Sequence, residues 1–290
     1  VHALDRDEEG ILRMAAFAFA EALNGGELAR FGADLEEAGS GDLLLRQHVA
    51  RLQGDIDGFA RLERAKPASL QDGTALAQWF LDLGRPADAL GWVEGDAGGL
   101  GESATRRTLV RAGALDALGR GRQAQDARWG RFAATLDAEA LRAFLARLGD
   151  FEEFDAADRA MAVAAAFPDP VAALRFLVEW PNLRAAGALV LARRASWTGR
   201  LDAAALADAA ERLGEGEPLA ATILRRVLAE TILARGWIDG FPAALAHLRQ
   251  LDELAAQLAE ADFAAAGIPE HAVWRRDLER RHPRRTAFWS

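Results

Sequence analysis

The sequence LAQWFLDLGRPADALGWV, from Leu76 to Val93, contains the pattern from which the fold of this chain can be predicted. It predicts an apolar helix that ends at Leu83-Gly84 and a second helix whose first turns contain the small residue Ala89. Glycine is favoured at such helix ends because it can take the left-handed conformation without a steric penalty. The stretch therefore predicts two helices joined by a tight turn.

The same pattern recurs in LVRAGALDALGRGRQAQDARW, from Leu109 to Trp129. Gly119 and Ala124 lie 35 positions after Gly84 and Ala89. A period of this length is typical of stacked helix pairs, tetratricopeptide-like, in which no pair can bury its apolar face alone.

The first helix of each repeat is expected to bury a large, a small and a large side chain. Leu76, Ala77 and Phe80 occupy these positions in the first copy, whereas Arg111 stands where the second copy would place a leucine. Weaker copies are predicted upstream at residues 52–63, one residue out of register, and downstream at residues 148–158.

Helix patterns continue in the second half of the chain. Between Asp137 and Gly149, leucines and a phenylalanine recur at helical spacing, with Asp137 as the expected N-cap and Gly149 as a left-handed terminator. The next helix, from Asp150, is expected to be amphipathic, with an apolar stripe formed by Phe151, Phe154, Ala157, Met161 and Ala165.

Two prolines bracket the stretch FPDPVAALRFLVEWP, from Phe167 to Pro181. Asp169 is the expected cap of a helix with Pro170 at its first position, where a missing amide costs nothing. Trp180 should end this helix and Pro181 should open the next. A helix that is apolar over so much of its circumference is expected to lie between neighbouring helices.

No run alternates apolar and polar residues in the manner of a strand, so the fold class is predicted to be all-α. We expect an α-solenoid of antiparallel helix pairs, tetratricopeptide-like, that stacks into a right-handed superhelix. Three regions are predicted: N-terminal helices at 1–40, the repeats at 41–150 and a C-terminal helical array at 151–290 that continues them. The eight tryptophans are expected mainly in the core, at the joints between helices.

Composition limits the functional classes. The chain has no cysteine, which excludes disulfides, thiolate metal sites and a cysteine nucleophile. Its apolar runs are far shorter than the ~20 residues of a membrane-spanning helix, so we expect no membrane association and a cytoplasmic location. A net charge of −9 argues against a general nucleic-acid binder.

Five segments of the chain resemble an uncharacterised bacterial family, the domain of unknown function family 6880. They are residues 52–94, 117–156, 173–193, 216–228 and 280–289, and the resemblance covers roughly residues 43–290. The resemblance implies a tetratricopeptide-like helical array of unassigned activity. It also implies a further helical region upstream, of which residues 1–40 would be a remnant.

No catalytic signature accompanies these helices. The glycine-rich segment from Gly95 to Ser103 follows a helix rather than a strand, so it is interpreted as a linker and not as a nucleotide loop. His247, His271 and His282 lack the spacing of a metal site. No cofactor and no metal are therefore expected.

Acidic residues at positions 152, 153 and 155 could supply carboxylates for general acid-base chemistry. They occupy the expected first turn of a helix, where negative side chains favour the positive end of the helix dipole. This capping role is the preferred interpretation.

Six arginines cluster near the C-terminus. The cluster is interpreted as a solvated face paired with Asp277 and Glu279, as a dock for the acidic remainder of the chain, or as a phosphate-binding patch. Its members are Arg275, Arg276, Arg280, Arg281, Arg284 and Arg285.

The leading functional hypothesis is a non-catalytic scaffold that binds a peptide or partner protein in a groove formed by the first helix of each pair. An enzyme or enzyme-accessory domain with a carboxylate and histidine site assembled by the fold is the alternative, and nucleic-acid binding through the arginine cluster is a weaker one. Alignment of the repeats on Gly84 and Gly119 places six polar residues in the groove. They are Gln71, Thr74, Gln78, Asp82, Arg106 and Asp116.

Overall fold

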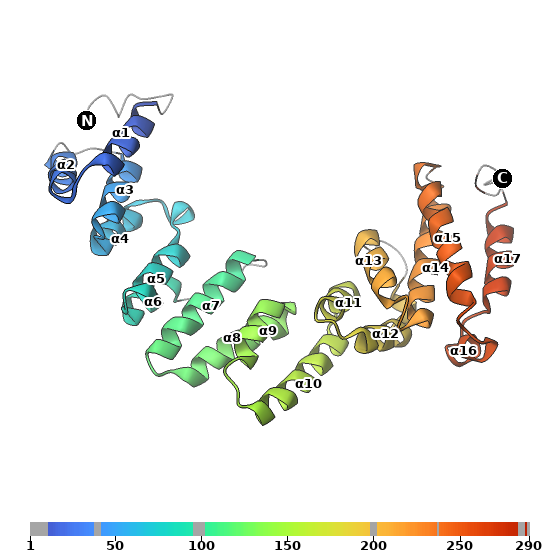
Figure 1. Cartoon of the computed structure of the whole chain (residues 1–290). Coiled ribbons are helices and arrows are strands. Elements are labelled where there is room, and N and C mark those ends of the chain that lie inside the picture. Colours follow the sequence, from blue (N-terminus) through green and yellow to red (C-terminus); the bar gives the residue numbers. More distant parts are fainter. Residues whose placement is uncertain are drawn as a thin grey trace. The chain divides into compact units, whose positions relative to one another are not determined.

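A computed structural model describes residues 11–37, 42–94, 102–197, 202–236, 238–283 and 288 (Figure 1). Over these residues the chain is helical and contains no strand, which confirms the all-α class. No described helix combines the length and the apolar character that a membrane crossing requires. The α-helices are α1 (Ile11–Ala22), α2 (Gly25–Glu37), α3 (Leu43–Gln53), α4 (Ile56–Ala65), α5 (Gly73–Asp82), α6 (Pro86–Val93), α7 (Glu102–Ala117), α8 (Gly121–Thr135), α9 (Ala138–Leu145), α10 (Asp150–Ala166), α11 (Pro170–Glu179), α12 (Leu183–Ala192), α13 (Ala203–Leu213), α14 (Pro218–Arg235), α15 (Phe241–Ala255), α16 (Glu260–Ala265) and α17 (His271–Arg281). Short 3₁₀ helices are η2 (Ala68–Leu70), η3 (Arg194–Ser196) and η4 (Ile238–Gly240).

The chain divides into two compact units. The N-terminal unit is Val1–Arg128 and the C-terminal unit is Trp129–Ser290, so the division falls inside α8. Each unit packs its helices mainly against neighbours in the sequence. The boundaries expected after residues 40 and 150 stay predictions.

Tight glycine turns join the helices of the N-terminal unit. Gly84 and Gly119 have φ angles of 71° and 73°, in the left-handed region that glycine favours. Gly84 donates its amide to the Leu81 carbonyl at 2.9 Å, and the next residue donates to Phe80 at 2.8 Å. The corresponding bonds after α7, to Asp116 and Leu115, measure 2.9 and 2.8 Å, so both helices end in the same Schellman motif.

Behind each turn, the following helix buries an alanine completely. These residues are Ala89 in α6 and Ala124 in α8, and both belong to one core cluster with residues of α4, α5 and α7. An alanine lets two helix backbones approach closely because its side chain is a single methyl group. The spacing of 35 residues in the sequence therefore corresponds to a repeated turn and to a repeated packing contact in the structure.

The predicted buried positions of the repeat are also occupied in the structure. Leu76, Ala77 and Phe80 are buried in α5. In α7, Ala112 is fully buried, while Arg111 is only partly buried at the position that lacks the leucine.

An earlier turn between α3 and α4 has the same form. Gly54 has a φ angle of 70° and donates to Arg51 at 3.1 Å, and Asp55 donates to Ala50 at 2.9 Å. The buried alanine of α4 is Ala60, six residues after this glycine instead of five. This agrees with an upstream copy that is one residue out of register.

Two expectations for the start of the C-terminal unit are wrong. Gly149 has a φ angle of −76° and is the N-cap of α10, not a left-handed terminator, because α9 already ends at Leu145. The buried face of α10 consists of Ala156, Ala160 and Ala164. Phe151 and Phe154 are exposed, so these two members of the predicted apolar stripe do not pack, whereas Met161 contacts the core.

Asp137 and Asp169 cap α9 and α11 as predicted, through bonds to the Ala140 and Val171 amides of 2.9 Å each. Helix α11 lies between α10, α12 and α13, in agreement with its broad apolar surface. Trp180 ends α11, but α12 begins at Leu183 rather than at Pro181. The difference arises because the Asn182 side chain accepts the Ala185 amide and thereby caps α12.

All six described tryptophans are buried or partly buried. Trp197 and Trp274 are buried, and their indole nitrogens donate to the Val190 carbonyl at 3.0 Å and to Glu230 Oε1 at 2.6 Å. Four others, at positions 79, 92, 129 and 180, are partly buried. Trp237 and Trp289 lie outside the described residues.

Because the two turns have the same geometry, replacing the glycine of either turn should have the same effect on stability. We expect Gly84→Ala and Gly119→Ala each to lower the free energy of unfolding by about 1 kcal/mol, because alanine is strained in the left-handed conformation. Gly91→Ala is the matched control: Gly91 lies inside α6 with open space around it, so alanine should raise stability by roughly 0.5–1 kcal/mol. Urea unfolding measures all three. A Gly84→Ala protein as stable as Gly91→Ala would contradict the assignment of the turn.

Candidate functional site

A groove of about 570 Å³ opens in the N-terminal unit, and we call it the α5 groove. Helices α3, α4, α5 and α7 contribute to it, together with the connection between α4 and α5. Its lining residues are Arg51, Phe59, Glu63, Lys66, Asp72, Ala75, Leu76, Gln78, Trp79, Asp82 and Arg106.

The buried carboxylate of Glu63 organises one side of this groove. Only 2% of Glu63 is exposed. Its Oε2 accepts from Gln47 Nε2 at 2.5 Å and from Lys66 Nζ at 2.7 Å, and its Oε1 accepts the Asp72 amide at 2.7 Å. Glu63 therefore joins α3, the end of α4 and the start of α5 through one side chain.

These bonds keep Glu63 ionised although it is buried. Burial raises the pKa of Glu63, but the hydrogen bonds from Lys66, the Asp72 amide and Gln47 together outweigh this effect, so its pKa lies below the usual 4.5. Lys66 is the one lysine of the chain. A cation at this position compensates the charge that the fold has buried.

Two aromatic rings form an apolar part of the groove. Phe59 of α4 and Trp79 of α5 are both partly buried, and their rings meet edge to face with centroids 5.4 Å apart. Both residues line the groove, so part of their ring surface is available to a ligand. The groove thus offers an aromatic surface beside the polar group around Glu63.

Charged side chains lie around this aromatic surface. Arg51 and Arg106 are exposed, and neither forms an ion pair with another described residue. Asp82 is also exposed and accepts a hydrogen bond of 2.8 Å from Gln78 Nε2. The two arginines come from α3 and α7, whereas the acid and the amide come from α5.

The structure brings three of the six predicted groove residues together: Gln78, Asp82 and Arg106 line the α5 groove. Gln71 lies near it and donates its Nε2 to the Lys66 carbonyl at 2.9 Å. Thr74 is partly buried and is not among the lining residues.

Asp116 has a different role, because it forms a 2.5 Å ion pair with Arg128 of α8. The pair links α7 to α8 within the N-terminal unit. The Asp116 carboxylate therefore connects two helices of the fold and does not line the α5 groove.

Sequence reasoning missed the contribution of α4, since the alignment used only the first helix of each pair. The missed residues include Phe59, Glu63 and Lys66, along with Asp72 at the cap of α5 and Arg51 of α3. One sequence signal could have indicated them: the one lysine of an arginine-rich chain stands three residues after a glutamate.

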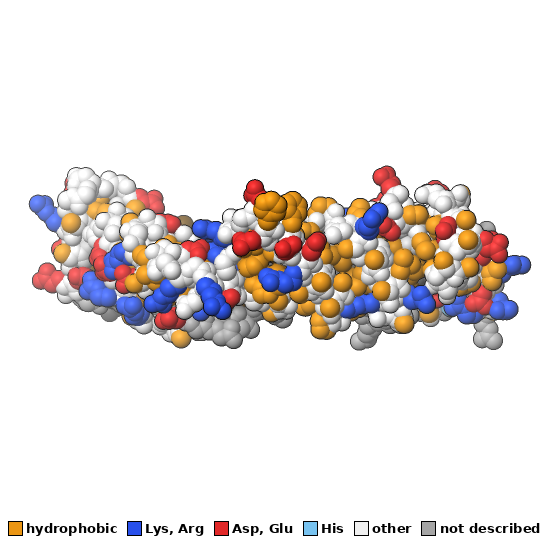
Figure 2. All heavy atoms as spheres, turned by 90° about the horizontal axis from the view of Figure 1, so that it is seen from below, with side chains coloured by type: hydrophobic (Ala, Val, Ile, Leu, Met, Phe, Trp, Pro, Cys, Tyr) orange, Lys and Arg blue, Asp and Glu red, His pale blue; other side chains and the backbone are white. Residues whose placement is uncertain are grey.

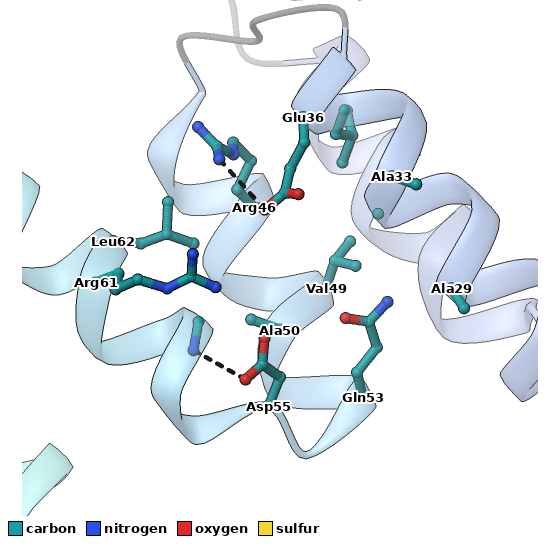
Figure 3. Close-up of a pocket in the computed structure, with 13 residues that line it drawn as sticks. Ala29, Ala33, Glu36, Arg46, Val49, Ala50, Gln53, Asp55, Arg61 and Leu62 are labelled. Atoms are coloured by element: carbon teal, nitrogen blue, oxygen red, sulfur yellow. Dashed lines mark hydrogen bonds and ion pairs between the residues drawn. The ribbon is translucent and has the colours of Figure 1, made fainter.

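A second, smaller cavity of about 290 Å³ lies between α2, α3 and α4 (Figure 3). Small apolar residues such as Ala33 and Val49 form much of its wall, and Arg61 extends into it from α4. Arg46 and Glu36 face each other across one end at 3.7 Å. Asp55 and Arg61 also line the cavity, but among its described lining residues no ion pair other than that of Arg46 with Glu36 is formed.

The C-terminal arginine cluster is largely occupied by ion pairs. Arg275 donates to both oxygens of Asp252 at 2.8 and 2.9 Å. Arg280 and Arg281 bind Asp277 at 2.5 and 2.8 Å.

Arg281 also reaches Glu230 at 3.2 Å. Arg276 is exposed and donates to the carbonyl of Ala272 at 3.3 Å. Arg284 and Arg285 lie outside the described residues. The described arginines of the cluster thus resemble the solvated, acid-paired face more than a phosphate site.

Of the three C-terminal histidines, His271 lies beside a carboxylate. His271 Nε2 lies 2.8 Å from Asp252 Oδ1, beside Arg275. Burial lowers the pKa of His247, and the charge of Arg225 adds to this effect. Within the described part of the chain, no group of three or more histidine, aspartate or glutamate side chains has the arrangement of a metal site.

Glu152 and Glu153 lie in the first turn of α10, as predicted, whereas Asp155 lies one turn further along the helix. Glu152 accepts the Gly149 amide at 3.5 Å, which is a capping contact. All three acidic residues are exposed to solvent. The Gly95 to Ser103 segment falls for the most part outside the described residues, and α7 begins at its end.

Comparison with known proteins identifies a family for the chain. The Family of unknown function (DUF6880) matches residues 38–290, and the chain belongs to this family. The match starts close to the position at which the resemblance of the sequence begins. Neither curated proteins nor solved structures give a match to the chain.

The Glu63 network predicts a pH-dependent contribution to stability. We expect Glu63→Gln to lower the free energy of unfolding at pH 7 by roughly 2–4 kcal/mol, since it removes the buried partner of Lys66. The pKa of Glu63 is lower in the folded chain, so its stabilising effect is complete above pH 4.5 and is lost as the pH falls through the folded value. The difference between wild type and variant should therefore shrink in acid.

Chemical unfolding between pH 3 and 8 measures this difference, with exposed Glu94→Gln as the control. Glu94→Gln should change stability by less than about 0.5 kcal/mol at every pH. A Glu63→Gln difference that stays constant over the range would contradict the lowered pKa.

Proposed function

We propose that this member of the family is a non-catalytic interaction scaffold whose α5 groove binds a peptide or an extended segment of a partner protein. In the same proposal, the helix pairs of the N-terminal unit form a tetratricopeptide-like α-solenoid. The observation that carries the proposal is the origin of the groove residues. Arg51, Asp82 and Arg106 come from α3, α5 and α7, the first helices of three successive pairs.

The repeated turns support the solenoid part of this proposal. Gly54, Gly84 and Gly119 each end the first helix of a pair in the left-handed conformation, with the same two backbone hydrogen bonds. The pairs are α3 with α4, α5 with α6, and α7 with α8. A surface built from the first helices of such pairs is continuous across repeats and is suited to an extended ligand.

The chemistry of the groove supports a peptide as the ligand. The Phe59 and Trp79 rings can cover an apolar side chain, as aromatic anchors do in protein interfaces. Gln78 offers an amide for the backbone of the ligand, and Arg51 and Arg106 can pair with carboxylates. The two rings contact each other and Gln78 is hydrogen-bonded to Asp82, so these groups are partly ordered before binding, which reduces the entropy cost of binding.

Glu63 also indicates that the groove is formed before a ligand binds. Its bonds to Gln47, Lys66 and the Asp72 amide fix the junction of α4 and α5 beside the aromatic pair. The ligand would therefore bind without prior ordering of this side of the groove. The bacterial and cytoplasmic setting expected from the sequence remains a prediction.

Charge reversal inside the groove tests the proposal. The double variant Asp82→Lys/Arg106→Glu keeps the net charge and replaces two exposed groove residues. We expect the proteins that copurify with the full chain to fall at least about tenfold in amount, because a misplaced charge of the same sign costs several kcal/mol in an interface. Affinity purification with quantitative mass spectrometry measures this loss.

Arg122→Glu/Asp126→Lys is the matched control, since both residues are exposed on α8 outside the groove and the exchange is again neutral. It should retain the same proteins as the wild type. Recovery of identical proteins in identical amounts with both double variants would show that the α5 groove is not the binding surface.

A further inference from the structure

Helix α10 of the C-terminal unit presents two phenylalanines to solvent. Phe151 is 91% exposed and Phe154 is 75% exposed, the highest values among the large hydrophobic residues of the described chain. The helix packs through Ala156, Ala160 and Ala164 on its other side. The core of the C-terminal unit therefore does not use either ring.

The two rings share one face of the helix. Residues three and four positions apart are neighbours on a helix surface, so Phe151 and Phe154 lie beside Asp155 and Asp158. Counted around the helix axis at 3.6 residues per turn, this face is opposite Ala160. Figure 2 shows hydrophobic side chains with acidic ones beside them on the face of the molecule that includes α10.

Five carboxylates lie on the first three turns of α10, and two of them, Asp155 and Asp158, share the face of the rings. All five are exposed, and none forms an ion pair with another described residue; they are Asp150, Glu152, Glu153, Asp155 and Asp158. The nearby Arg159 is held over the Trp129 ring, with its guanidinium carbon 4.1 Å from the ring centroid. The acidic charge around the phenylalanines is thus not neutralised by it.

We propose that Phe151 and Phe154, with the carboxylates around them, dock onto a partner protein that presents an apolar patch bordered by lysine or arginine. Aromatic side chains anchor interfaces when a partner excludes water from them. The acidic border adds complementarity to a basic rim and would raise the rate of association. A basic partner is favoured over a second copy of this chain, whose net charge is −9.

This surface is separate from the α5 groove, and its residues belong to the other unit. The capping role of Glu152 does not compete with docking, because the bond to the Gly149 amide leaves the rest of its carboxylate exposed. Docking at Phe151 and Phe154 can therefore be tested independently of the function proposed for the α5 groove.

The test uses a synthetic amphipathic helical peptide of leucine and lysine as the probe, and a leucine–glutamate peptide of the same pattern as its counterpart. Fluorescence anisotropy with the full chain measures binding of each. We expect the leucine–lysine peptide to bind, and Phe151→Ser/Phe154→Ser to weaken it at least about tenfold. Asp155→Asn/Asp158→Asn should weaken it several-fold and reduce its dependence on salt.

Ile238→Ser is the matched control, because Ile238 is an exposed apolar residue of the same unit that lies outside α10 and has one acidic residue, Asp239, beside it in its short helix. It should bind the peptide as the wild type does. Circular dichroism and thermal melting should show all these variants folded, since α10 packs through its alanines.

Three results would overturn the inference. One is equal binding of the leucine–lysine peptide by the wild type and by Phe151→Ser/Phe154→Ser. Another is equal binding of the leucine–glutamate peptide. The third is adsorption to phosphatidylcholine vesicles that requires both phenylalanines, without peptide binding, which would assign the surface to a membrane.

Discussion

Each helix of this chain covers its apolar surface mainly with the helices next to it in the sequence. Helix α11 lies between α10, α12 and α13, and α14 packs against α12, α13 and α15. The described core is accordingly distributed over four clusters of buried residues, each confined to one of the two units. Local burial of this kind makes every helix dependent on its neighbours and leaves whole helix faces open to solvent.

One buried carboxylate, that of Glu63, organises the polar side of the α5 groove in the N-terminal unit. Glu63 lies where α3, α4 and the start of α5 meet, and it is neutralised by Lys66 from within the same groove. An ionised side chain is costly to bury unless every oxygen is satisfied, so this junction has little freedom to rearrange. The aromatic pair of Phe59 and Trp79 beside it is correspondingly fixed.

The helices and their turns could be predicted because their signals are local. Gly84 and Gly119 mark a conformation that only glycine adopts easily, and Asp137 and Asp169 mark helix starts through hydrogen bonds that span two or three residues. The choice of the buried face was harder where two faces were both apolar. In α10 the alanines pack and the phenylalanines do not, and helical periodicity alone cannot distinguish a core face from an exposed one.

The candidate site was predictable only in part. Gln78, Asp82 and Arg106 followed from the repeat, since equivalent positions of successive first helices come together. Arg51, Glu63 and Lys66 did not follow, because the upstream pair is shifted by one residue and its second helix also reaches the groove. Pairings such as Asp116 with Arg128 depend on three-dimensional proximity that spacing does not encode.

The scaffold function proposed for this chain depends on binding of a partner segment in the α5 groove. Hydrogen–deuterium exchange of the full chain, with and without a purified copurifying protein, measures where the partner binds. We expect the partner to slow amide exchange in α5 and in the adjoining parts of α3, α4 and α7, with no comparable change in α8. Slower exchange confined to other helices, or unchanged exchange in α5 with the partner bound, would contradict it.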